Sequence, residues 1–271
     1  PVDPLDYCAL NVALYTPRGK VWSLDERDRS RVYRTASSLT LGASTVSWEG
    51  DTLVFRIRER TTPFLTARPL GDSRIVGKVT VRPRVRVGEP HALDADGAHL
   101  WWSAAPSARV EVELDEPRMR WKGDGYHDAN AGSAPLEAHF SRWSWARGHA
   151  ADGGTVLAYD VALAGGGRRS RRVVAAADGS VAAIEQTISQ RIRGTAWGLE
   201  REAPVDASAS AAPRVARALE DTPFYARALV ETTLGGRAVT AMHEELSLER
   251  LQRRWVQALL GFRMGRRSWA R

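Results

Sequence analysis

Alternating apolar and polar residues dominate the first half of the chain. Residues 52–58, 77–87 and 108–114 each place apolar side chains at every second position. A strand with this pattern buries one face and exposes the other, as strands of antiparallel sheets commonly do. Short segments rich in Gly, Pro and Asp separate these stretches and are typical of turns. The pattern therefore predicts an all-β fold, either a sandwich or a barrel.

The second half continues this pattern. Its predicted strands are residues 154–163, 171–175, 180–184, 215–219, 224–232 and 238–245. Glycine-rich connections join the first three, which is typical of hairpins. The last three can close a second sheet.

Two segments of the second half do not fit the alternation. Residues 203–213 are rich in Ala and Ser, and we interpret them as a surface excursion. Residues 246–262 mix helical and extended patterns. In a helix, Leu248, Leu251 and Trp255 would share one face.

Length, charge and cysteine content narrow the class of protein. The 271 residues suffice for one or two domains with sizeable cores. The net charge of +7 arises almost entirely from Arg. Such a bias favours an anionic membrane surface over nucleic acid, and we expect no nucleic-acid partner. The single Cys8 excludes an internal disulfide, and no apolar run approaches the roughly 20 residues of a membrane span.

Polar and aromatic groups crowd into residues 121–132, between three glycines. If this stretch is a strand, alternation places Tyr126 and Asp128 on one face and His127 on the other. The alternative is an aromatic-rich hairpin in which Asp and Asn have turn roles.

A second short motif, residues 99–102, contains a histidine and two tryptophans. By alternation His99 and Trp101 share a face. The alternative is a core tryptophan beside a surface histidine.

Several kinds of chemistry lack support in the sequence. The six histidines include no helical pair separated by a glutamate, so we expect no metal site. Cys8 lies in an apolar strand, and no Gly-x-Ser-x-Gly motif is present, so a hydrolase nucleophile is not expected. A dinucleotide-binding fold would need parallel βαβ units.

A carboxylic acid with aromatic neighbours remains. Apolar surroundings formed with Tyr126, and with His99 and Trp101, would keep Asp128 protonated as a general acid. Protonation of an isolated alkene creates a carbocation, which the face of a tryptophan can stabilise by about 2 kcal/mol or more in a dry site. These residue types therefore fit cation chemistry on an apolar substrate.

Seven sequence blocks follow one another along nearly the whole chain: residues 3–15, 99–102, 123–132, 143–145, 219–227, 242–248 and 255–264. In this order they resemble the carotenoid 1,2-hydratases, also called hydroxyneurosporene synthases. The resemblance implies two lipocalin-like antiparallel β-domains with few short helices, packed together, which we place at residues 1–146 and 147–271. It also implies a further N-terminal stretch before Pro1, so we expect the first domain to lack its first strands.

The resemblance also implies an activity. The expected reaction is addition of water, without cofactor or metal, to the terminal 1,2 double bond of an acyclic carotene such as neurosporene or lycopene. By analogy with the family, Asp128 protonates the alkene, Trp101 faces the tertiary cation, and Tyr126 or His99 positions the water. The alternatives are a cyclase or isomerase on the same scaffold, or a carotenoid or lipid carrier without activity.

The expected location is the bacterial cytoplasm, with an option of peripheral contact at the inner face of the membrane. The arginines of residues 263–271 could rest on anionic lipids there. A solvated tail is the alternative.

Overall fold

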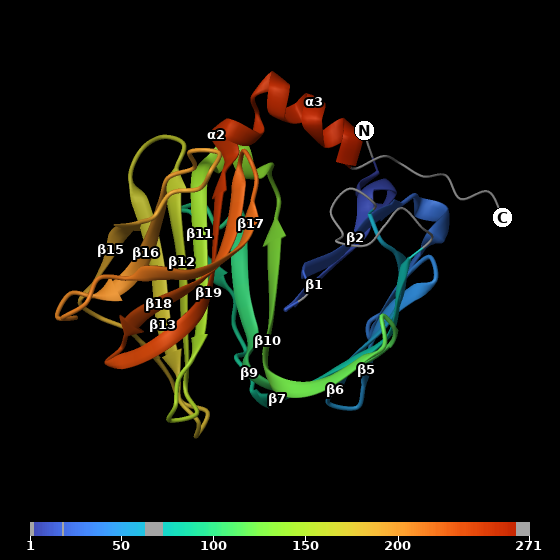
Figure 1. The fold of residues 1–271 in the computed structure, drawn as a ribbon, viewed down its shortest axis with the longest axis horizontal. Helices are drawn as coiled ribbons and strands as arrows, with labels where there is room; N and C mark the ends of the chain where they lie inside the picture. The colour runs from blue at the N-terminus through green and yellow to red at the C-terminus, as the bar shows by residue number, and fades with distance from the viewer. Residues whose placement is uncertain (1–2, 18, 63–72, 264–271) are drawn as a thin grey trace. The chain divides into compact units, whose positions relative to one another are not determined.

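The computed structural model describes residues 3–17, 19–62 and 73–263 (Figure 1). The chain groups into two compact units. The first comprises residues 1–83, 109–125 and 258–271, and the second comprises residues 84–108 and 126–257. Antiparallel strands dominate both units, so the all-β prediction with few short helices is confirmed.

The two compact units divide the chain differently from the two lipocalin-like domains predicted at residues 1–146 and 147–271, and that domain division stays a prediction. The predicted boundary lies inside β11 (Phe140–His149), within the second unit. The sequence division differs because two long strands, β9 (His99–Glu116) and β10 (Met119–Gly132), each contribute residues to both units. Because each of these strands is continuous, the amino-acid composition does not change where the chain passes from one unit to the other, and the sequence shows no boundary there.

The first unit contains a β-hairpin and a sheet. The hairpin pairs β1 (Cys8–Thr16) with β2 (Gly19–Arg27), after a 3-10 helix η1 (Pro4–Tyr7). In the sheet, which runs in the order β10-β9-β7-β6-β5-β4-β3, the remaining elements are η2 (Arg29–Arg31), β3 (Val32–Arg34), β4 (Ser38–Leu41), β5 (Ser44–Glu49), β6 (Thr52–Arg60) and β7 (Arg74–Val85).

Alternation builds the apolar core of the first unit. Ile57 of β6, Ile75 of β7 and Leu114 of β9 are buried together. Gly77 lets β7 approach β9 closely, because a Cβ there would lie 2.3 Å from the backbone oxygen of Glu113. Its φ of +150° is also open mainly to glycine.

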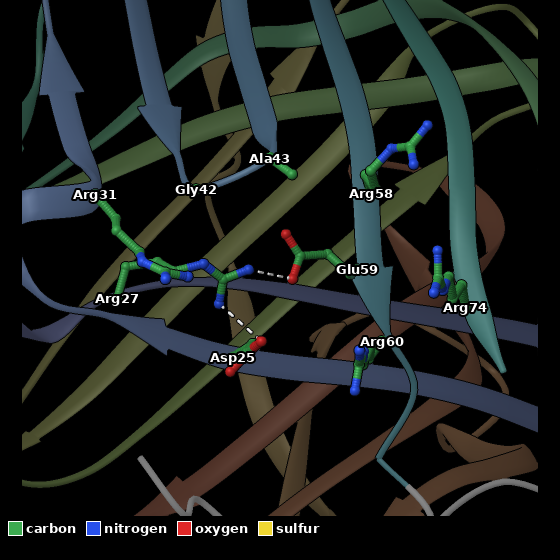
Figure 2. A pocket seen from close by; sticks show the side chains of 9 residues that line it. All are labelled: Asp25, Arg27, Arg31, Gly42, Ala43, Arg58, Glu59, Arg60 and Arg74. Carbon is green, nitrogen blue, oxygen red and sulfur yellow. Dashed lines mark hydrogen bonds and ion pairs between the residues drawn. The ribbon is translucent and has the colours of Figure 1, made fainter. Parts of the chain in front are cut away.

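Charged side chains line a cavity of about 330 Å³ in the first unit (Figure 2). The buried guanidinium of Arg27 contacts Glu59 at 2.7 Å and Asp25 at 3.0 Å. Burial raises the pKa of Glu59, against the lowering effects of a hydrogen bond from Ser44 and the Arg27 charge. Because Arg27 already pairs with two carboxylates, this network is an internal ion pair and not a site prepared for an anion.

The second unit is built on a seven-stranded antiparallel sheet with the order β14-β13-β12-β11-β19-β18-β17 (Figure 1). Its further strands are β12 (Thr155–Leu163), β13 (Arg168–Ala175), β14 (Val181–Ala183), β17 (Arg214–Asp221), β18 (Tyr225–Leu234) and β19 (Arg237–Ser247). All six strands predicted for this half are present.

A separate ribbon pairs β15 (Thr187–Ile192) with β16 (Arg201–Asp206). The surface excursion predicted for residues 203–213 is wrong in its first part, because Ala203 and Val205 are buried at 1% exposure. Small residues carry little alternation signal, and here β16 packs against β18 and β11. Tertiary packing therefore decides the structure of this segment.

The segment predicted as ambiguous forms two helices, α2 (Leu248–Leu251) and α3 (Arg254–Arg263). The expected common face is wrong for Trp255, which is 46% exposed and stacks on Trp197. The break between the helices shifts the register, so Val256 is buried instead. None of the described helices has both the length and the apolar character that crossing a membrane requires.

Buried ionisable groups lie inside the second unit on β19. Glu245 is fully buried and forms an ion pair with Arg142, while His243 Nε2 lies 2.8 Å from the carbonyl of Glu202. Burial raises the pKa of Glu245 to about 7, although Arg142 opposes the shift. Burial likewise lowers the pKa of His243 to about 4.

We expect Glu245→Gln to change how stability depends on pH. Because the folded protein binds the Glu245 proton more tightly than the unfolded chain, this contribution is complete below pH 4.5 and is lost as pH rises through about 7. Relative to the parent protein, the variant should therefore gain roughly 3 kcal/mol of unfolding free energy between pH 4.5 and pH 8.

Urea unfolding at several pH values measures this difference. Glu249→Gln, which alters an exposed glutamate on α2, serves as the control and should leave it unchanged. A Glu245→Gln variant whose stability runs parallel to that of the parent protein at every pH would contradict the assigned shift.

Candidate active site

The glycine-flanked stretch 121–132 lies within β10, so the hairpin alternative is wrong. Its glycines do not form a turn. Gly132 is instead required by packing, because a Cβ there would lie 3.0 Å from the His99 ring. Residues 126–128 are half-buried, whereas residues 129–132 are exposed.

His99 and Trp101 occupy the start of β9, and both belong to the second unit with β10 residues 126–132. Both side chains are buried, at 3% and 0% exposure. Trp102, on the opposite face of the strand, is 38% exposed. The alternative of a surface histidine is therefore wrong. β8 (His91–Ala92) pairs with β9 opposite Trp101 and covers it.

A hydrogen bond joins two of the predicted site residues across different strands. Trp101 Nε1 donates to Asp128 Oδ2 at 2.9 Å. The indole N–H group therefore fixes the Trp101 ring next to the carboxyl group of Asp128, which is half-buried.

Aromatic rings surround this pair. Trp101 lies 5.3 Å from Tyr159, and Tyr126 lies 5.3 Å from Trp145, measured between ring centroids. Tyr126 and Trp145 pack against the core cluster that contains Trp101 and Tyr159. The site therefore combines one carboxyl group with a wall of π faces.

Tyr126 Oη and Trp145 Nε1 in this wall are buried and make no hydrogen bond of normal geometry among the described residues. Tyr126 Oη nevertheless lies close enough to the Asp128 carboxyl group and to the N–H groups of Trp101 and Trp145 for all three to influence its pKa. Burial, followed by the negative charge of Asp128, raises the pKa of Tyr126, and the same two causes raise the pKa of Tyr159. Both phenols are therefore neutral near pH 7. An unsatisfied buried donor costs about 1–3 kcal/mol, which marks this place as one that a water or ligand can complete.

The hydrogen-bond partners of His99 are Asp94 and the backbone of Ala134, and not Asp128. Its Nδ1 lies 2.7 Å from Asp94 Oδ2, and its Nε2 lies 3.0 Å from the Ala134 carbonyl. His139 Nδ1 also contacts Asp94 Oδ2, at 3.1 Å. The three side chains form a group that could offer ligands to a metal ion. Sequence reasoning missed Asp94 and His139, because Asp94 lies in a segment whose Asp and Gly residues are typical of a turn.

The arrangement can supply a proton from a carboxyl group to an apolar group held against aromatic rings. Two of the described cavities are larger than 300 Å³, one at the Arg27 network and one beside β17 to β19. Asp128 lines neither of them.

Known structures support the fold. A crystal structure described as AttH, from Nitrosomonas europaea, superposes with a TM-score of 0.62 and 14% identity, over 89% of this chain and 80% of that chain. At this identity the similarity concerns the fold alone.

Known sequences identify the family. A family model described as carotenoid hydratase CrtC matches residues 2–271. An acyclic carotenoid 1,2-hydratase of Thiocapsa roseopersicina is 40% identical over 97% of this chain, which spans 63% of that protein. A protein of the same name from Cereibacter sphaeroides is 35% identical over 99% of this chain, which spans 92% of it. The chain therefore belongs to the carotenoid hydratase CrtC family.

Proposed function

We propose that this chain is a hydro-lyase that adds water to the 1,2 double bond of an acyclic carotene and forms a tertiary alcohol. The relatives carry this activity in their names. The observation that supports it most directly is the Trp101 to Asp128 hydrogen bond, which places a carboxyl group at the N–H edge of a buried indole.

The reaction begins with proton transfer from Asp128 to the alkene carbon that carries a hydrogen. The π electrons form the new C–H bond, so the positive charge develops on the neighbouring, dimethyl-substituted carbon. Asp128 Oδ2 accepts from Trp101, and Oδ1 carries the transferred proton. A positioned general acid typically contributes about 10²–10⁴-fold to rate.

The tertiary cation then lies against aromatic rings. Trp101 is fully buried, and Tyr159 lies beside it. A desolvated cation–π contact stabilises positive charge by about 2 kcal/mol or more. The Asp128 carboxylate formed in the first step adds a favourable negative charge.

Water completes the product. We assign its binding to Tyr126 Oη, which can accept a hydrogen bond from the water, and to Trp145 Nε1, which can donate one to the water oxygen. The second lone pair of the water oxygen then stays free for the cation. The water oxygen bonds to the cationic carbon, and the proton that it loses returns to the Asp128 carboxylate. Atoms balance as one alkene plus one water, and the chemistry needs neither a cofactor nor a metal ion.

The substrate choice and location extend this proposal. We propose an acyclic carotene of the neurosporene or lycopene type, and action in the bacterial cytoplasm at the inner face of the membrane. The arginines at residues 264–271 that would contact anionic lipid lie outside the described residues, so this contact stays a prediction.

Incubation with dispersed lycopene or neurosporene, followed by mass spectrometry of the extracted pigment, tests the proposal. We expect a product heavier by one molecule of water. A product of unchanged mass but different retention would indicate a cyclase or isomerase. Bound, unchanged carotene would indicate a carrier, and either result would refute hydration.

A further inference from the structure

Three segments of the second unit meet at one buried carboxylate. Asp94 lies between β8 and β9, His99 begins β9, and His139 ends α1 (Leu136–His139). Asp94 and His99 are 3% exposed, and Asp94 Oδ1 also accepts from the backbone N–H of His99 at 3.3 Å. The sequence patterns grouped His99 with Trp101 and Asp128, and they gave Asp94 and His139 no place in a site.

The two ring nitrogens of His99 both face oxygen acceptors. Ala134 offers a carbonyl, which can only accept. Burial acts to raise the pKa of Asp94, but the hydrogen bonds from His99 outweigh it and lower that pKa, so Asp94 is a carboxylate. The His99 ring is therefore held from both sides, by Asp94 and by the Ala134 carbonyl.

The distances favour hydrogen bonds over metal ligation. Ligand atoms about 2.0–2.1 Å from a tetrahedral zinc ion are roughly 3.3 Å apart. Asp94 Oδ2 and His99 Nδ1 are only 2.7 Å apart, which is the length of a charge-assisted N–H to O bond. The group is thus arranged as an ion pair with a second donor, His139.

This group fastens the start of β9 to the end of β10. Ser133 N–H donates to the Ala98 carbonyl at 2.9 Å, and the His99 ring packs on Gly132 and, at 4.8 Å, on Phe140. Trp101 follows His99 by two residues on the same face, and its partner Asp128 precedes Gly132 on β10. Anything that releases His99 loosens the strands that carry the Trp101 to Asp128 pair.

We propose that Asp94 is a positioning residue, which acts through its hydrogen bond to His99 to hold Trp101 and Asp128 in register for proton transfer. The role rests on the proposed hydration and deepens it, since His99 serves as a clamp and not as the group that binds water.

Nitrogen-15 NMR of the histidine rings tests the clamp without any assay of activity. In the parent protein, His99 Nδ1 should show a hydrogen bond to the Asp94 carboxyl group, and Asp94→Asn should weaken or remove it. A parent protein in which His99 Nδ1 makes no hydrogen bond to Asp94 would overturn the proposal. So would one equivalent of tightly held metal ion that Asp94→Asn abolishes, since it would make the group a metal site.

Steady-state kinetics with a dispersed acyclic carotene tests the positioning role. Asp94→Asn should lower kcat on the order of 10- to 100-fold with little change in KM, because the side chain orients the reacting groups and does not touch substrate. Asp96→Asn, an exposed neighbour in the same connection, is the matched control and should keep the parent kcat. A folded Asp94→Asn variant with the parent kcat would overturn the role.

The two experiments separate the proposals. If the parent protein hydrates no carotene, the proposed function fails, while the NMR result still decides whether Asp94 clamps His99. If hydration proceeds and His99 makes no hydrogen bond to Asp94, only the clamp fails.

Discussion

Asp128→Asn is expected to lower carotene hydration by about 10³-fold or more. The amide keeps the shape and can still accept from Trp101 Nε1, but it has no acidic proton to give to the alkene. The first step therefore loses its acid, while the packing around it stays. Initial rates of product formation at saturating carotene measure the effect.

Binding of carotene should survive this substitution, because Asp128 contributes little apolar contact. Asp124→Asn, four residues earlier on β10 and exposed, is the matched control and should retain the parent rate. If Asp128→Asn turns over at a rate close to that of the control, then Asp128 is not the proton donor.

Trp101→Leu is expected to combine loss of activity with loss of stability. The leucine removes the π face beside the developing cation, which corresponds to about 30-fold in kcat for 2 kcal/mol. Because Trp101 is fully buried, truncation also leaves a cavity, and we expect a loss of about 3 kcal/mol of unfolding free energy. Kinetics and urea unfolding measure the two effects separately.

Trp101→Phe separates the cation from the hydrogen bond. It keeps an aromatic face but loses the donor to Asp128, so its kcat should fall between those of the parent and Trp101→Leu. Trp102→Phe, on the exposed face of β9, is the control and should have the parent kcat. Equal kcat values for Trp101→Leu and the parent would remove the cation role, whatever the change in stability.

Much of the fold could be predicted from the sequence because alternation is a local property. Residues 52–58 lie in β6, and residues 238–245 lie in β19, as their patterns indicate. The β16 strand could not be predicted, because Ala203 and its neighbours are small and their burial depends on β18. The break between α2 and α3, which exposes Trp255, likewise depends on tertiary contacts.

The candidate site divides in the same way. Tyr126 and Asp128 are two residues apart on one strand, so their common face follows from spacing, and the family resemblance pointed to Trp101 and His99. The partners of His99 were not predictable, because Asp94 resembles a turn residue and His139 is distant in sequence. A polar clamp formed by several segments leaves no periodic pattern in any one of them.

Hydration of an acyclic carotene in water enriched in deuterium and oxygen-18 tests whether this chain hydrates the 1,2 double bond by an acid-initiated reaction. We expect the product to carry one labelled oxygen on the tertiary carbon and one deuterium on the adjacent carbon, as proton transfer followed by water addition requires. A product without the labelled oxygen, or with oxygen but no deuterium on the adjacent carbon, would contradict acid-initiated hydration by this chain.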